Sequence, residues 1–421
     1  MNDCWYGLGG LNYKHGYTSC CAIQHNRLAW FKDSYLPSEI YNSKNFIKLR
    51  NDLANGEWPS GCNLCQDMVE KGVRQTAMIN DVPAANLQHL NKNGVMKFAG
   101  LRHIELRFSN ACNMACLHCS TVYSSQWQKK LQGYVPQYDD YYLDQLNANV
   151  HVKDGEDPSK LGLSTAQVEE ICNDLNKNFP RIEKVDISGG EVLIQKQFWK
   201  TLELLADHPN AKKMFMTFYS NFNAEADYER LSDMLSKFGT SDITISIDAG
   251  TNIYPYFRDG NWNKLVDNIG KFRAVNDFTN LKCVVTFSAY QLMDIENIYK
   301  SIYPLDFFAV KTALVQTPKY INPAILIHDF RDELLEDFNN AFDYIKSLPK
   351  SDNGCHPLSV RMSLEHYLVG LKKYLFESPL PHYRDYNNFL LYIGKTDKLW
   401  NQNFNDHFEK FKYIEGEIVR A

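Results

Sequence analysis

Three cysteines in one short loop are the clearest chemical feature of this chain. Cys112, Cys116 and Cys119 form a C-x3-C-x2-C run that directly follows the apolar stretch 103–108. Three thiolates this close in sequence can each bind one iron of a [4Fe–4S] cube, which leaves the fourth iron without a protein ligand. Clusters that only transfer electrons usually have four cysteine ligands. The spacing therefore predicts a cluster whose open iron takes part in chemistry.

Zinc is the main alternative for these three cysteines. Zinc prefers four ligands in proteins, and His118 or a remote side chain could supply the fourth. Three buried thiols without a metal are a second, simpler interpretation.

A second motif lies downstream, where a short strand predicted at 184–188 ends in Gly189-Gly190-Glu191. Two glycines at the end of a strand let a ligand lie against bare backbone. A carboxylate beside them can bind an ammonium group. An isolated Gly-Gly-Glu is most often an ordinary turn. It indicates a ligand-binding site only because it follows the cysteine loop.

Strand-like and helix-like segments alternate after the cysteine loop. Further strands are predicted at 214–219, 242–248, 281–287 and 307–315, and helices between them at 165–178, 225–238 and 261–275. In the first helix the apolar side chains recur on one face, as Val168, Ile171, Cys172 and Leu175. This alternation predicts parallel βα units with right-handed crossovers.

Polar residues follow several of these predicted strands. Ser220-Asn221 and Asp248 stand at strand ends, as do the cysteine loop and Gly-Gly-Glu. In βα barrels the chemistry is placed at the carboxyl ends of the strands. The sequence therefore predicts one site that these residues share.

Together the motifs resemble the radical S-adenosylmethionine (SAM) superfamily, whose signature is a C-x3-C-x2-C loop after the first barrel strand. In that family the open iron binds the amino and carboxylate groups of SAM. The reduced cluster then cleaves SAM to methionine and a 5′-deoxyadenosyl radical, which abstracts hydrogen from a substrate. One residue departs from the pattern, because many members have an aromatic residue where this chain has His118.

The resemblance implies an α/β fold with a partial (β/α)6 TIM-type barrel at residues 99–318, with six strands counted from Ile104. It assigns Gly189, Gly190 and Glu191 to the SAM amino group. It also assigns further cofactor-binding residues near SAM, its ribose or the substrate: Ser220, Asn221, Ser246, Asp248 and Arg258. The alternatives are a helix cap for Ser220-Asn221, a core hydroxyl for Ser246 and a solvated turn for Arg258.

Residues 1–98 contain a second group of cysteines: Cys4, Cys20, Cys21, Cys62 and Cys65. The last two form a C-x2-C pair on a Pro/Gly turn, which suits metal ligation. A zinc knuckle and a disulfide are the alternatives, and the absence of a secretory segment argues against the disulfide.

This region resembles the SPASM/twitch auxiliary-cluster modules, in a group that places the module before the barrel. The matching residues are Cys4-Trp5, Gly16 with Cys20-Cys21, Asn42-Ser43 with Arg50, and Cys62 and Cys65 with Glu70 and Arg74. The resemblance implies a second [4Fe–4S] cluster with four cysteine ligands, which suits electron transfer or structure. Either Cys20 or Cys21 is then surplus.

Two further regions are less informative. An acidic, tyrosine-rich insertion at about 128–163 is either a lid or substrate-recognition element or a solvated loop. Residues 319–421 form a predicted helical C-terminal region, with helices at 329–348 and 358–375 and a tail from Pro381.

Composition sets the remaining limits. The 421 residues are 44% hydrophobic and carry a net charge of −5, so the chain can bury a large core and has no basic footprint for nucleic acid. No run of 18 apolar residues predicts a membrane span, and we expect a cytoplasmic protein. By resemblance, flavodoxin or ferredoxin would supply the electron.

The substrate is the most open question. A peptide or protein is the first expectation, because twitch and SPASM relatives often modify peptides, and a small metabolite is the second. A different class remains as an alternative, namely a zinc-binding scaffold or regulatory protein without enzymatic activity.

Overall fold

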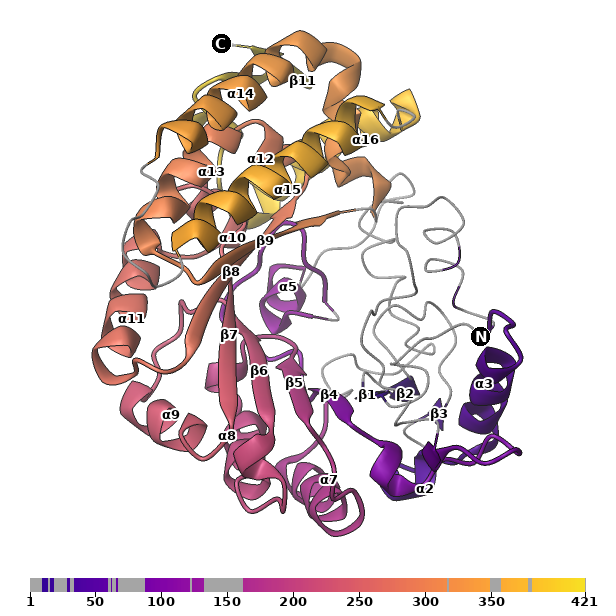
Figure 1. Ribbon diagram of the computed structural model, residues 1–421. Helices are drawn as coiled ribbons and strands as arrows, with labels where there is room; N and C mark the ends of the chain where they lie inside the picture. Colours follow the sequence, from indigo (N-terminus) through magenta and orange to yellow (C-terminus); the bar gives the residue numbers. More distant parts are fainter. Residues whose placement is uncertain are drawn as a thin grey trace. The chain divides into compact units, whose positions relative to one another are not determined.

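The computed structural model describes residues 10–13, 16–18, 29–30, 34–59, 62, 66, 88–121, 123–131, 162–315, 318–348, 357–377 and 381–420. The chain divides into two compact units (Figure 1). The first unit comprises Met1–Ser109, Leu161–Phe218 and Asp227–Asp242. The second comprises Asn110–Lys160, Tyr219–Ala226 and Ile243–Ala421.

The first unit is built on parallel strands. Strands β4 (His103–Arg107), β5 (Lys184–Ser188) and β6 (Phe215–Ser220) pair in parallel register. Upstream of β4 lie β1 (Gly10–Tyr13), β2 (Gly16–Thr18) and β3 (Ala29–Trp30). Strand β1 pairs in parallel with β4, so this part of the N-terminal region extends the sheet.

One face of these strands is apolar and completely buried. Alternate residues such as Ile104, Val185 and Met216 are 0% exposed, because helices α7 (Thr165–Asn178) and α8 (Lys196–Leu205) cover this face. Helix α7 begins at Ser164 with a capping box, as its sequence favours. Its predicted bounds, 165–178, are confirmed, and its predicted apolar face is buried.

The N-terminal region of this unit also contains helices α2 (Pro37–Ile40) and α3 (Lys44–Ala54). Arg50 of α3 is buried and donates hydrogen bonds to the side chain of Asn42 and to the carbonyl oxygen of Tyr41. Asn42 and Ser43 thus directly precede helix α3, with Ser43 as its N-cap residue, and Arg50 lies within it. Helix α9 (Tyr228–Leu235) completes the unit and is shorter than the predicted 225–238.

The second unit continues the alternation. Strand β7 (Thr240–Ser246) is followed by β8 (Asn280–Phe287) and β9 (Ala309–Leu314), and β8 and β9 pair in parallel. The connecting helices are α10 (Tyr254–Arg258), α11 (Trp262–Val275), α12 (Ala289–Leu292) and α13 (Ile295–Ile302). Strands β4 to β9 follow chain order in a six-strand parallel sheet, which is consistent with the predicted partial TIM barrel.

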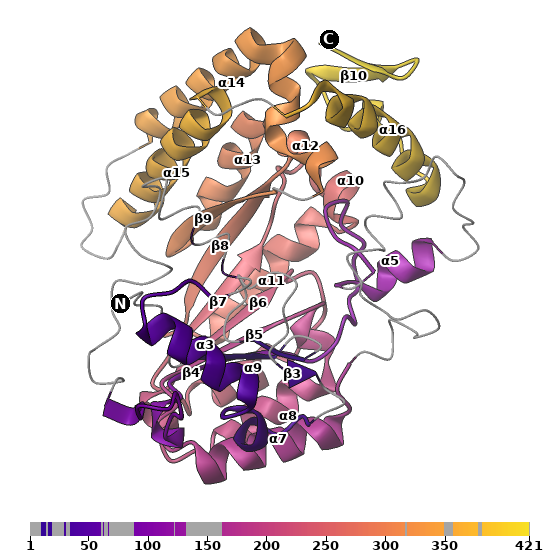
Figure 2. The ribbon, with the colours of Figure 1, turned by 90° about the vertical axis from the view of Figure 1, so that its right-hand side faces the viewer.

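The C-terminal region is mainly helical, as predicted. It contains α14 (Ile327–Ser347), α15 (Pro357–Glu377) and α16 (Tyr383–Trp400), with α14 packed beside α15 (Figure 2). The chain then ends in a hairpin of β10 (Phe411–Ile414) and β11 (Glu417–Arg420), which the sequence analysis did not predict. Lys410 and Arg420 both pair with the buried carboxylate of Asp337 on α14.

Short elements complete the described chain. Helix α5 (Ser125–Lys130) follows the cysteine loop, and it includes the first residues of the predicted insertion 128–163, most of which lies outside the described residues. The 3-10 helices are Phe98–Gly100, Val192–Ile194, Ala211–Lys213, Tyr303–Leu305, Lys319–Ile321, Pro323–Leu326 and Phe404–Asp406. No helix in the described part of the chain is long and apolar enough to span a membrane.

Candidate active site at the cysteine loop

The three cysteines of the loop lie at different depths in the second unit. Cys112 and Cys116 are buried, whereas Cys119 is partly exposed. The loop is tightly turned, because the backbone N–H of Cys119 donates to the carbonyl oxygen of Cys116 at 2.8 Å. Both backbone groups of Cys112 are bound by side chains of the following helix, Ser125 and Gln126. The loop therefore has a defined conformation of its own.

Residues 257–259, at the end of α10, hold the middle of this loop. The Cys116 thiol donates to the carbonyl oxygen of Arg258 at 3.4 Å. Two backbone N–H groups of the loop are bound by the neighbours of Arg258: Leu117 donates to the Phe257 carbonyl oxygen at 2.9 Å, and Ala115 donates to Asp259 Oδ2 at 3.2 Å. This segment connects the loop to the polypeptide that follows strand β7.

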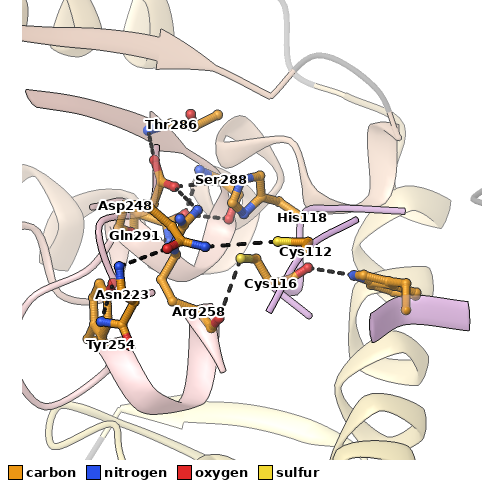
Figure 3. A network of polar contacts seen from close by, with 12 residues as sticks. Cys112, Cys116, His118, Asn223, Asp248, Tyr254, Arg258, Thr286, Ser288 and Gln291 are labelled. Carbon is orange, nitrogen blue, oxygen red and sulfur yellow. Dashed lines mark hydrogen bonds and ion pairs between the residues drawn. The ribbon is translucent and has the colours of Figure 1, made fainter. Parts of the chain in front are cut away.

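A buried ion pair lies beside the cysteines (Figure 3). Arg258 Nη1 lies 2.6 Å from Asp248 Oδ2, and the two side chains are 6% and 1% exposed. The backbone N–H of Thr286 donates to Asp248 Oδ1 at 2.6 Å, and Gln291 Nε2 donates to the Asp248 carbonyl oxygen at 2.7 Å. Asp248 itself has a left-handed backbone conformation, with φ +58°. Arg258 is therefore not part of a solvated turn, and its guanidinium is paired with a carboxylate of its own chain.

The electrostatics of the pair extend to the cysteines. Burial alone would lower the pKa of Arg258, but the nearby Cys116 and Asp248 raise it above its ordinary value. Conversely, burial raises the pKa of the Cys116 thiol well above its usual range, while Arg258 lowers it. Without a metal this thiol is therefore protonated, and irons would have to displace its proton.

His118 behaves as an aromatic ring. Its imidazole stacks on the Phe257 ring, with centroids 5.0 Å apart and planes 9° from parallel. Burial lowers the pKa of His118 to about 4, so the ring is neutral near pH 7. Its Nε2 lies 3.7 Å from Asp248 Oδ2, and its buried Nδ1 has no hydrogen-bond partner among the residues that the structure describes. A neutral stacked imidazole explains how histidine can stand where relatives have an aromatic residue.

The Ser220-Asn221 pair also lies in the second unit. Asn221 Nδ2 lies 3.9 Å from the Cys112 sulfur and donates to Asn113 Oδ1 at 2.8 Å. Ser220 Oγ instead accepts from the backbone N–H of Phe222 at 2.9 Å, which fixes a turn whose Phe222 has φ +53°. The structure thus brings Asn221 to the cysteine loop, while Ser220 has a local structural contact and caps no helix there.

The three thiols suit a multinuclear cluster better than a single ion. The three cysteines stand in one loop, within residues 112–119. Yet within the described ranges no three His, Cys, Asp or Glu side chains are gathered as ligands of a metal ion. A four-iron cube takes one thiolate per iron, so its ligands need not approach a common point. The donor set therefore fits the predicted cluster.

The Gly-Gly-Glu motif belongs to the first unit and directly follows β5. Gly189 and Gly190 have φ +101° and +54°, so both lie in backbone regions that favour glycine. Glu191 is completely buried, and its Oε1 accepts from the backbone N–H of Leu193 at 3.0 Å, at the start of a 3-10 helix. Gln195 Nε2 donates to the Gly189 carbonyl oxygen at 2.8 Å. The motif is thus a turn that requires glycine at two positions and that carries a buried carboxylate.

Replacing Gly189 by Ala is expected to lower the free energy of unfolding by about 2–3 kcal/mol, because a left-handed backbone and a steric clash add up. A Cβ at this position would clash with Arg107 Cγ and lie 3.0 Å from the Ser109 carbonyl oxygen. Chemical denaturation of both proteins measures the difference. Gly270→Ala is the matched control: it lies within helix α11 with no atom in the way, so it should stabilise by up to about 1 kcal/mol. An equal effect of the two changes would contradict the prediction.

Of the remaining predicted site residues, the structure describes Ser246 and Cys62. Ser246 is the last residue of β7 and is partly exposed. Cys62 is described and partly exposed, whereas Cys4, Cys20, Cys21 and Cys65 lie outside the described residues, as do Trp5, Glu70 and Arg74. The proposed auxiliary site therefore stays a prediction.

Sequence reasoning missed three aromatic residues that bind the loop backbone: Trp127, Tyr392 and Trp400. Two of them lie on α16, far from the cysteines in sequence, and have no spacing that could have indicated the contact. Only Trp127, a few residues after the loop, could have been suspected.

A model of the Radical SAM superfamily matches residues 106–288. This segment is a radical SAM domain. It contains the cysteine loop, Gly-Gly-Glu, Asp248 and Arg258, and it ends at Ser288 after β8. A radical SAM domain indicates an enzyme, and it implies S-adenosylmethionine and a [4Fe–4S] cluster as cofactors. No curated protein sequence is significantly similar to the chain.

Solved structures of radical SAM proteins resemble the fold at low sequence identity. SuiB from Streptococcus suis bound to S-adenosylmethionine is 13% identical over 68% of this chain and 58% of its own, with a TM-score of 0.38. The enzyme anSMEcpe with bound AdoMet is 17% identical over 60% of this chain and 68% of its own, with a TM-score of 0.33. TsrM, a radical SAM methyltransferase from Kitasatospora setae, is 11% identical over 51% of this chain and 36% of its own, with a TM-score of 0.32. The chain thus covers just over half of SuiB.

Proposed function

We propose that this enzyme reductively cleaves S-adenosylmethionine at a [4Fe–4S] cluster held by Cys112, Cys116 and Cys119, and that it abstracts a hydrogen atom from a peptide or protein substrate. The observation that carries the proposal is the position of the three cysteines: one loop inside a radical SAM domain, with two buried thiols and a backbone bound on both sides. When bound, the cluster and SAM supply a 5′-deoxyadenosyl radical, and the protein supplies binding and orientation.

The chain's own residues have separate tasks in this proposal. Residues 257–259 bind the cysteine loop by hydrogen bonds, and the Asn221 amide contacts the Cys112 sulfur. The Asp248–Arg258 pair keeps a positive charge beside the cysteines without leaving that charge unpaired in the interior. Ser246, at the end of β7, stays a predicted contact for SAM or substrate.

The proposal assigns the SAM amino group to the Gly189-Gly190-Glu191 turn. Replacing Glu191 by Gln is expected to raise the dissociation constant of SAM roughly tenfold, because a hydrogen bond to a charged group is lost. Gln keeps an oxygen that can accept from the backbone N–H of Leu193, so the turn should stay intact. Equilibrium dialysis with labelled SAM measures the affinity. Unchanged affinity would remove Glu191 from the SAM site.

A second [4Fe–4S] cluster at the N-terminal cysteines belongs to the same proposal. Cys4, Cys62 and Cys65, with either Cys20 or Cys21, would be its four ligands. This assignment depends on the resemblance to SPASM/twitch modules. Zinc is the competing occupant, and metal analysis of the reconstituted protein separates the two.

A peptide or protein substrate is proposed on the same resemblance, and a small metabolite is the alternative. The test is an anaerobic reaction with SAM and a chemical reductant or reduced flavodoxin or ferredoxin, in which 5′-deoxyadenosine is measured by mass spectrometry. Candidate short peptides encoded near the gene should raise its formation and change mass themselves. Stimulation by small metabolites alone would favour the alternative, and zinc-containing protein without SAM cleavage would overturn the enzymatic proposal.

A further inference from the structure

The backbone of the cysteine loop is bound by aromatic side chains from elsewhere in the second unit. Three successive carbonyl oxygens, those of residues 115–117, each accept one hydrogen bond from such a side chain. The pairs are Trp400 Nε1 with Ala115 at 2.8 Å, Trp127 Nε1 with Cys116 at 2.8 Å, and the Tyr392 hydroxyl with Leu117. Tyr392 and Trp400 lie on α16, which is outside the matched residues 106–288.

These donors are deeply buried. Trp127, Tyr392 and Trp400 are 0%, 1% and 6% exposed, so water cannot replace a hydrogen bond that one of them loses. The rings of Trp127 and Trp400 also contact each other edge to face, with centroids 4.6 Å apart. Through this contact the two tryptophans join helix α5 to helix α16 next to the cysteine loop.

The N–H groups of the same segment are bound as well. Those of Ala115 and Leu117 donate to Asp259 and Phe257, as described above. The peptide group between Cys116 and Leu117 is consequently fixed through both its donor and its acceptor, and the peptide group before Cys116 is fixed through its acceptor, the Ala115 carbonyl oxygen. The loop cannot rotate a peptide plane here without breaking a buried hydrogen bond, which is unfavourable.

We propose that α16 is a structural part of the cluster site, and that Tyr392 and Trp400 are positioning residues that keep the cysteine loop in its cluster-binding conformation. The proposal rests on the proposed cluster at Cys112, Cys116 and Cys119. Because such coupling is reciprocal, the bound cluster in turn stabilises the docking of α16. The C-terminal region then determines how long the cluster is retained.

The first test compares the variants Tyr392→Phe and Trp400→Phe. Each removes a hydrogen-bond donor and keeps an aromatic ring. In the anaerobically reconstituted protein, release of iron to a chelator is expected to be roughly tenfold faster in each variant, and faster still in the double variant. The electron paramagnetic resonance spectrum of the reduced cluster should change as well, since the Cys116 backbone shifts.

The chain offers matched controls for both variants. In Tyr299→Phe the lost hydroxyl belongs to a buried side chain of α13, is not on α16, and has no hydrogen-bond partner in the described part of the chain. In Trp199→Phe the lost Nε1–H bonds the Leu193 carbonyl oxygen at 3.0 Å. The two tryptophans are also alike in having a cation over the ring. Arg230 lies 4.7 Å from the Trp199 ring centroid, and Lys130 lies 5.7 Å from the Trp400 ring centroid. Iron release and the spectrum should match wild type in both controls.

The second test needs no variant. Hydrogen exchange of the wild-type protein is compared with and without the cluster, and amides of α16 should exchange more slowly when the cluster is present, whereas those of α14 should change little. If the loaded protein shows no such protection and the variants release iron as the controls do, this proposal alone is overturned. Wild-type protein that takes up no iron at Cys112, Cys116 and Cys119 would overturn the proposed function and this inference with it.

Discussion

Replacing Cys112, Cys116 and Cys119 together by Ala is expected to remove about four irons per chain and to abolish SAM cleavage. Three thiolates are the only protein ligands proposed for the catalytic cube, and a cube cannot be held without them. Iron and sulfide are measured after anaerobic reconstitution, and 5′-deoxyadenosine formation is measured with a chemical reductant. The change from about eight to about four irons would also indicate a second cluster, whereas a change from about four to none would leave zinc or free thiols at the N-terminal cysteines.

The control for this prediction is a Cys172→Ala/Cys283→Ala variant. Both residues are buried cysteines outside the loop, on α7 and β8, with exposed fractions of 0%. Burial raises the pKa of both thiols, which are therefore protonated and inert. This variant is expected to keep all its iron and to lose only some stability. Full iron content and activity in the triple variant would contradict the assignment of the cluster.

Replacing Asp248 by Asn is expected to lower the free energy of unfolding of the cluster-free protein by about 3–5 kcal/mol. The change leaves the buried Arg258 guanidinium without its counter-ion, and an unpaired charge in the interior is strongly unfavourable. Asn keeps an oxygen that accepts from the backbone N–H of Thr286, so the variant mainly loses the negative charge of Asp248. Denaturant titration measures the effect. Cluster occupancy should fall too, because Arg258 and its neighbours hold residues 115–117.

Two comparisons test whether the loss of stability comes from leaving a buried charge unpaired. Arg230 and Glu203 form an ion pair with the same 2.6 Å separation, but their side chains are 44% and 42% exposed. Glu203→Gln should therefore cost less than about 1 kcal/mol. In addition, the double variant Asp248→Asn/Arg258→Gln should be less destabilised than the sum of its single changes, since each removes the partner of the other. Equal costs for Asp248→Asn and Glu203→Gln would contradict the prediction.

Several features of the fold follow from local sequence. Helix α7 has the predicted bounds because its apolar period and its Ser164 capping box act over neighbouring residues. Strand ends are less well predicted, and β7 begins at Thr240 rather than at residue 242. Strand length depends on which backbone groups find partners on other strands, and that information is not local. The C-terminal hairpin was missed for the same reason.

The sequence by itself indicated the chemistry that we propose for this protein. The spacing of Cys112, Cys116 and Cys119 suits the proposed cluster, and it can be recognised in the sequence. Gly189 and Gly190 can be recognised as well, because their positive φ angles require glycine. Only the tertiary structure decided what holds that chemistry in place. The Asp248–Arg258 pair and the bonds from Tyr392 and Trp400 join residues that are distant in the chain. Such contacts are selected by burial and packing once the chain has folded, and burial leaves no regular spacing in the sequence.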